Sequence, residues 1–188
     1  MKKHFIFILI LMSALQDVIL ARPGSDIFLQ DTLPVPNIPN LLFYIQRDPN
    51  SNTICYQLNV DRQGKLDTKN PVHAFWIRYP EGGAIKELSF IQNKFAYGLK
   101  VTPMGDGAFE LKSVAYTRSP LYLRKDSLNR YRVYIAVKRK EHVLKRIFVR
   151  IDGGSKLSPN VVYIELKVMD PDTGKVVIER INKPSPTG

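Results

Sequence analysis

Two stretches of sequence, YRVYIAV at residues 131–137 and VLKRIFVRI at residues 143–151, decide the fold class. In the first, the apolar residues Val133, Ile135 and Val137 stand at every second position. The same period of two recurs in TICYQLNV at residues 53–60 and in VYIELKV at residues 162–168. Alternation over a short run bounded by turn residues is typical of a β-strand with one buried face. The sequence therefore predicts an antiparallel sheet protein.

Further short apolar runs predict strands at 42–47, 72–79, 108–114, 121–124 and 175–181, and the turn at 170–174 predicts a C-terminal hairpin. One segment departs from this period. Between residues 84 and 97, Ala84, Leu88, Ile91 and Phe95 recur at spacings of four, three and four, and Gly98 follows, which predicts a helix that stops at a glycine. We expect a mainly β, two-layer antiparallel β-sandwich with one short α-helix; a partly open β-barrel is the alternative.

The first residues have the pattern of a secretory signal peptide. A positive start is followed by an apolar run from Phe5 to Leu15 and a small residue at Ala21. The run is well short of the roughly 20 residues that span a bilayer, so no transmembrane helix is expected after signal removal. We expect a signal peptide at 1–21, a Pro-rich extended lead-in at 22–40, a single β-sandwich domain at 41–181 and a flexible tail at 182–188. The protein should be exported, to the periplasm or the outside of the cell.

Positive charge is concentrated in one part of the chain. The 28 Lys and Arg residues against 17 Asp and Glu residues give a net charge of +11. Removal of residues 1–21 takes away two Lys residues and one Asp residue, which leaves +10. Residues 130–150 hold eight basic residues and one acidic residue, so they carry +7 of that charge. A binding role would therefore involve an anionic partner.

A hairpin of residues 131–151 would place this charge on one surface. If Val133, Ile135 and Val137 pair inward with Ile147, Val149 and Ile151, cations and aromatic rings alternate on the outward faces. An anionic lipid, an acidic glycan or an acidic protein would suit such a surface, whereas export argues against nucleic acid. The alternative is a solvated edge that prevents aggregation and binds nothing. The candidate binding residues on this hairpin are Arg132, Tyr134, Lys138, Arg146, Phe148 and Arg150.

Few other residues suggest a catalytic or metal-binding role. Cys55 and His73 are the available nucleophile and base, although each also reads as an ordinary strand residue. Asn59 to Gly64 begins like a calcium loop, but Asn70 stands where the closing carboxylate is needed, so a hairpin turn is the better interpretation. With one Cys and two His residues after residue 21, no Cys/His zinc site can be assembled. No metal site and no cofactor is expected.

Three stretches carry a family resemblance: NPVHAFWIRY at 70–79, ELSFIQ at 87–92 and FAYGLK at 95–100. With them the chain resembles an uncharacterised family of short secreted bacterial proteins, domain of unknown function 4833. The resemblance extends over roughly residues 41–181. It implies export and a single domain, and it carries over no functional site.

The end of the 72–79 strand and the end of the helix suggest a second site. Arg78, Tyr79 and Tyr97 could converge there on a small anionic ligand. The alternative is a core strand from whose end Arg78 emerges. The sequence thus favours a non-catalytic binding module for an anionic envelope component. A small hydrolase using Cys55 and His73, or a structural envelope protein, are the alternatives.

Overall fold

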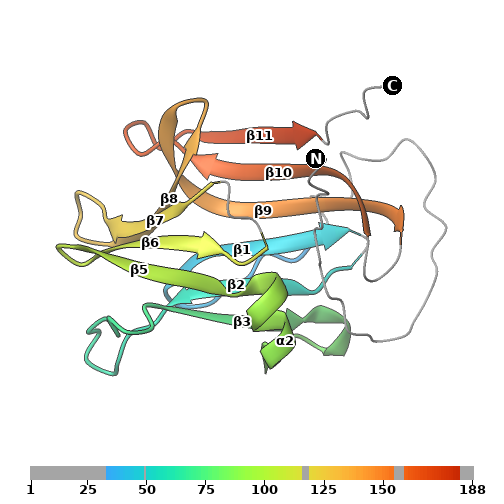
Figure 1. The fold of residues 1–188 in the computed structure, drawn as a ribbon, viewed down its shortest axis with the longest axis horizontal. Helices are drawn as coiled ribbons and strands as arrows, with labels where there is room; N and C mark the ends of the chain where they lie inside the picture. The colour runs from blue at the N-terminus through green and yellow to red at the C-terminus, as the bar shows by residue number, and fades with distance from the viewer. Residues whose placement is uncertain (1–32, 49, 116–118, 155–158, 183–188) are drawn as a thin grey trace, which may run out of the picture.

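The computed structural model describes residues 33–48, 50–115, 119–154 and 159–182. In this part of the chain the fold is mainly β with one short helical segment, as expected (Figure 1). The helical segment comprises the α-turn α2 (Phe90–Gln92) and the π-turn η2 (Asn93–Tyr97), and a separate 3-10 turn, η1 (Tyr79–Glu81), follows β3. The strands are β1 (Leu41–Asp48), β2 (Thr53–Leu58), β3 (Val72–Arg78), β4 (Ala84–Glu87), β5 (Leu99–Gly105), β6 (Ala108–Ser113), β7 (Leu121–Lys125), β8 (Tyr131–Val137), β9 (Lys140–Gly154), β10 (Pro159–Met169) and β11 (Val176–Asn182).

Strand β9 joins all the others into one sheet. The sheet order is β4-β3-β2-β1-β9-β8-β7-β6-β5; β10 pairs with β9 as well, and β11 pairs with β10. Val143 pairs with Tyr134 of β8 and with Met169 of β10, so β8 and β10 lie on opposite edges of β9. Further along β9, β1 pairs with Arg146 to Arg150 on the same edge, beyond the point where the pairing with β8 ends. The sheet therefore divides along β9 into a first wing, β1–β4, and a second wing, β5–β8.

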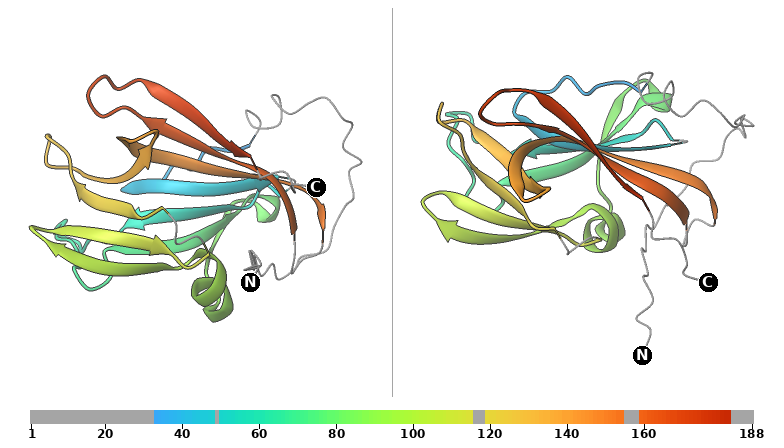
Figure 2. Two further views of the ribbon diagram at one scale, coloured as in Figure 1. Left: turned by 45° about the horizontal axis from the view of Figure 1, so that its top comes forward. Right: turned by 90° about the horizontal axis from the view of Figure 1, so that it is seen from above.

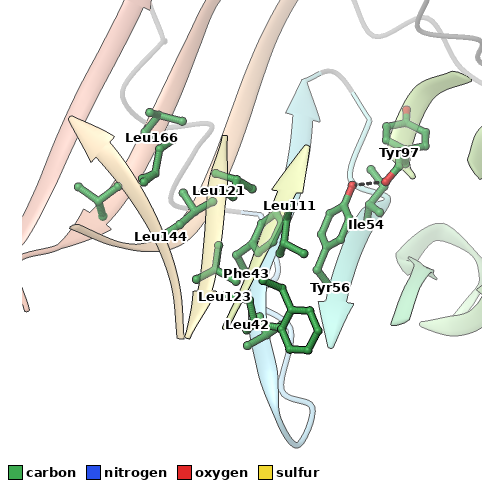
Figure 3. Packing of buried hydrophobic residues seen from close by; sticks show 14 of the residues in the cluster. Leu42, Phe43, Ile54, Tyr56, Tyr97, Leu111, Leu121, Leu123, Leu144 and Leu166 are labelled. Carbon is green, nitrogen blue, oxygen red and sulfur yellow. Dashed lines mark hydrogen bonds between the residues drawn. The ribbon is translucent and has the colours of Figure 1, made fainter. Parts of the chain in front are cut away.

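The two wings curl toward each other and enclose the main core between them (Figure 2). Phe43, Ile54 and Tyr56 of the first wing lie in the same buried cluster as Leu111 and Leu123 of the second (Figure 3). The rings of Phe43 and Tyr56 stack at 4.3 Å. The result is a curled, open half-barrel whose wings face each other like the layers of a sandwich. One pairing, β1 with β9, is parallel, so the sheet is not purely antiparallel.

The helix predicted for residues 84–97 is shorter than expected. Residues 84–87 form β4, which pairs with β3, and the helical turns begin only after Ser89. The Ser89 and Gln92 side chains cap this start reciprocally, which defines it. Gly98 ends the segment in extended conformation, with φ −67°. A Cβ on Gly98 would lie 2.0 Å from the carbonyl oxygen of Asn93, so the position needs glycine for close approach and not for a positive φ.

The pairing predicted within residues 131–151 is wrong. Val137 pairs with Lys140 across a two-residue loop, Lys138 and Arg139, in which both residues have positive φ. Because this loop is so tight, β9 starts three residues earlier than expected. Ile147 consequently lies beyond the reach of β8 and pairs with β1 on one side and β10 on the other.

The described part of the lead-in packs on the outer face of the first wing. Pro36 is buried, and the amides of Gln46 and Gln57 donate to the carbonyls of Pro34 and Pro39 at 2.7 and 2.8 Å. The segment lies over a second apolar cluster, made of Tyr44, Cys55, Phe75 and Ile77. The expected signal peptide lies outside the described residues, as does all of the expected tail except Asn182. Within the described ranges, no helix is long and apolar enough to cross a membrane.

Acids on the neighbouring strands compensate two basic residues of β9. Glu165 of β10, which is 2% exposed, pairs with Arg146 and with Arg180, each at 3.3 Å. Asp48 at the end of β1 pairs with Arg150. The pairs of Arg146 and Arg150 join β9 to its neighbours β10 and β1, and the pair of Arg180 joins β11 to β10, so these charges serve the strand pairing.

Replacement of Glu165 by Gln should therefore destabilise the protein strongly. It would leave Arg146 buried without this carboxylate, which costs about 3–5 kcal/mol in comparable buried pairs. Glu141→Gln is the matched control, because it removes an exposed carboxylate that pairs with Arg124, and exposed pairs contribute only about 0–1 kcal/mol. Urea unfolding measures both. Equal losses in the two variants would contradict the structural role of Glu165.

Candidate functional site

The six candidate residues of residues 131–151 do not share one outward surface. Arg146 and Phe148 are buried, at 8% and 1% exposure. Arg150 is paired with Asp48. The cause is that this part of β9 has β1 on one edge and β10 on the other. Lys138 lies in the β8–β9 loop and pairs with Glu179 at 2.7 Å.

Arg132 and Tyr134 instead lie on the outer face of the second wing, where Arg132 belongs to a different group of cations. Arg132 is the register partner of Arg124 on β7. On its other side, continuation of the β8–β9 register from Tyr134 and Val143 places Lys145 opposite Arg132. The Arg124 guanidinium covers the Tyr134 ring, with its carbon 4.3 Å from the ring centre. We call Arg124, Arg132 and Lys145, with Arg130 beside them, the basic row.

The basic row keeps a net positive charge. Asp126 pairs with Arg130 at 2.9 Å and with Arg132 at 3.4 Å, and Glu141 pairs with Arg124. Hydrogen bonds, the largest from the backbone of Arg130, lower the pKa of Asp126 to about 2, so this carboxylate stays charged at neutral pH. Four cations against two carboxylates leave +2. The pKa of Lys145 is lowered, first by burial and then by repulsion from Arg132 and Arg130.

The site predicted at the end of β3 is only partly assembled as expected. Tyr79 packs against the second apolar cluster, on the outer face of the first wing. Arg78 lies on the inner side by strand alternation and pairs with Glu81 at 2.6 Å. Tyr97, at the end of η2, is 3% exposed and lies in the main core. Its backbone carbonyl accepts a hydrogen bond from the Tyr56 hydroxyl at 2.7 Å (Figure 3).

The residue that Tyr97 meets is Arg47, which the sequence reasoning did not single out. The Nη1 of Arg47 donates to the Tyr97 hydroxyl at 2.9 Å, and its guanidinium carbon lies 5.4 Å from the centre of the Trp76 ring. Trp76 in turn meets Tyr97 edge-on, with ring centres 5.2 Å apart. Arg47 is 5% exposed, and this burial lowers its pKa. Among the described residues, no carboxylate pairs with it.

Arg47 and two residues that the strand register places next to it carry unsatisfied polar atoms. Its Nε, the Oδ1 of Asn52 and the Nε of Arg78 are all buried without a hydrogen-bond partner among the described residues. Ile45, Ile54 and Trp76 are register partners across β1, β2 and β3. Two positions further along, the same register places Arg47, Asn52 and Arg78 side by side. We call these three residues and Tyr97 the interior polar cluster. Arg47 follows Phe43 and Ile45 at every second position. This alternation was the signal in the sequence that Arg47 belongs to the inward face of the strand.

Cys55 and His73 do not form a reactive pair. Cys55 is completely buried beside Phe75, and burial raises the pKa of its thiol to about 12. His73 is paired across the strands with Gln57 and contacts the carboxylate of Glu87 at 2.9 Å. A nucleophilic cysteine needs an accessible thiolate, which this environment disfavours. The hydrolase alternative therefore has no support from the geometry.

Neither the hollow beside His73 nor the turn at Asp61 provides a metal site. An open hollow of about 300 Å³ is lined by residues that include Asn59, Asn70, His73 and Glu87. Asp61 accepts hydrogen bonds from the amides of Gln63 and Lys65, as expected for a hairpin turn. In the described part of the chain, no group of three or more His, Cys, Asp or Glu residues could hold a metal ion.

Cys55, the single cysteine, should resist thiol reagents in the folded protein. At pH 8, burial and a pKa of about 12 leave almost no accessible thiolate. Labelling with a maleimide should be at least about 100-fold slower in buffer than in 6 M guanidinium chloride, where the thiol is free. Mass spectrometry over time measures both rates. Comparable rates would show that the thiol is accessible and would restore it as a candidate nucleophile.

Comparison with known proteins identifies the family and nothing finer. No curated protein and no solved structure matches the chain. Residues 43–180, which run from β1 into β11, match the model of the family described as Domain of unknown function (DUF4833). This match covers well over half of the chain and confirms the resemblance seen in the sequence; the chain belongs to this family.

Proposed function

We propose that the protein is a non-catalytic binding module for an acidic glycan, and that the basic row is its contact surface. The observation that carries this proposal is the row itself. Arg124, Arg132 and Lys145 come from three neighbouring strands and lie side by side on one face, with Arg130 next to them and a net charge of +2. Neighbouring strands are about 4.8 Å apart, so the cations form a closely spaced line. Several screened contacts of this kind act together on a polyanion.

A glycan suits this surface better than a lipid membrane. Insertion into a membrane interface uses exposed apolar side chains next to the cations. In the basic row the aromatic side chain is Tyr134, which is 6% exposed and covered by Arg124. The exposed apolar residues Phe90, Ile91 and Phe95 lie on the α2–η2 segment, in a different element. The row thus offers charge and hydrogen-bond donors on a sheet face, which match carboxylate or sulfate groups along a sugar chain.

The basic row should retain the protein on a sulfated glycan column. The triple variant Arg124→Gln, Arg132→Gln and Lys145→Gln should elute from heparin-agarose at clearly lower salt than the unchanged protein, because three of the four cations are lost. The salt concentration at elution is the measurement.

A matched control separates this surface from net charge. Arg62, Lys69 and Lys175 are exposed and lie in turns away from the row. Their replacement by Gln removes the same charge and should change the elution much less. Equal shifts in the two triple variants would refute a local glycan site. Retention on anionic vesicles with none on heparin would favour a lipid partner instead.

We also propose that the protein is exported, since an acidic glycan of the cell envelope is met outside the cytoplasm. The support is the pattern of residues 1–21, which lie outside the described residues. Intact mass spectrometry of the protein from producing cells should show a chain that begins near Arg22. A mass that includes residues 1–21 in the exported fraction would contradict cleavage at Ala21.

A further inference from the structure

We propose that the interior polar cluster is a binding site for a small organic carboxylate that carries a hydroxyl or an amide N–H group next to its acid. The cluster lies on the inner side of the first wing, whereas the basic row lies on the outer face of the second. The two sites are therefore separate. The inference starts from Arg47, a guanidinium that is 5% exposed and has no carboxylate partner among the described residues.

The charge of the cluster points to one singly charged acid. A buried cation without an anion is costly, and proteins normally pair such a group. The other buried arginine, Arg146 of β9, is paired with Glu165, and Arg78 in the cluster has Glu81. Only the charge of Arg47 is left without compensation within the cluster. A monocarboxylate would neutralise it, whereas a phosphate dianion would add one excess negative charge.

The unsatisfied atoms define what the ligand must offer. The Nε of Arg47 and the Nε of Arg78 are donors that require an acceptor, which a carboxylate supplies through two oxygens. The Oδ1 of Asn52 is an acceptor that requires a donor. A hydroxyl or an amide N–H group beside the acid satisfies it. Hydroxy acids, open-chain sugar acids and the C-terminal ends of small peptides all have this combination.

Aromatic rings and a rigid turn hold the cluster in place. Trp76 and Tyr97 meet edge-on beside Arg47, and the Nε1 of Trp76 donates to Gln92 at 3.3 Å. The same Gln92 oxygen accepts from the amide of Ser89 at 2.9 Å, which ties the tryptophan to the helix cap. The side chain of Arg78 is 22% exposed and marks the side on which the cluster meets solvent.

The single tryptophan of the chain provides a direct readout, because Trp76 contacts Arg47. We would titrate the full-length protein with D-gluconate, an open-chain sugar acid, and with N-acetylglycine, which mimics the end of a peptide, and follow tryptophan fluorescence at constant ionic strength. At least one of them should give a saturable change, and the tighter of the two identifies a sugar acid or a peptide end as the source. Acetate should bind more weakly because it lacks the second group. If sodium chloride or phosphate gives the same response, or neither carboxylate saturates, the proposal is wrong.

Variants test whether Arg47 holds the ligand. Arg47→Met should abolish the saturable response, and it should fold at least as stably as the unchanged protein, because an apolar side chain of similar length replaces a buried charge without a partner. Should Arg47→Met fail to fold, Asn52→Ala is the second variant, and it should weaken binding at least about tenfold. Arg124→Gln, in the basic row, should leave the titration unchanged. A full response in Arg47→Met, or unaltered binding in Asn52→Ala, would overturn the proposal.

Discussion

The fold depends on the sharing of one strand, β9, by three partners. Its first residues pair with β8 and its later residues with β1, both on one edge, while β10 occupies the other edge. Because the backbone of β9 is hydrogen-bonded on both edges, the strand is held within the sheet. The two wings are therefore fixed at the point where β8 ends and β1 begins along β9. The wings then close over Phe43, Tyr56 and Leu111. The same sharing explains why Arg146 and Arg150 need the acids Glu165 and Asp48 beside them.

The two proposed sites follow from the two kinds of surface that this arrangement creates. The outer face of the second wing meets solvent, so its cations remain partly exposed and available to a polymer. The inner side of the first wing turns polar where β1 and β3 end, at Arg47 and Arg78. There the core gives way to polar groups whose hydrogen bonds are incomplete. Incomplete satisfaction of buried polar atoms is uncommon in folded proteins, and it is therefore an informative feature of this site.

Much of the secondary structure followed from local pattern. The strands around Val133 and Ile164 and the hairpin at 170–174 are present where period and turn residues indicated them. Strands β4 and β5 were missed. Residues of β4 fitted a helical spacing as well as a strand, and β5 contains Pro103, which interrupts a strand pattern. At the candidate sites, Tyr97 lies against Arg47 and Trp76, whereas Tyr79 packs on the outer face of the first wing.

By itself, the sequence determined the mainly β class, the excess of positive charge, the single cysteine and the single tryptophan, because these depend on composition and on spacing along the chain. Only the tertiary structure decided which cations are available. Arg146 looked like a surface residue and is buried, whereas Arg124 joins Arg132 on an outer face. Arg47 looked like the end of a strand and lies against Tyr97, 50 residues away. Burial and charge compensation depend on partners that are distant in the chain, and local periodicity contains no information about them.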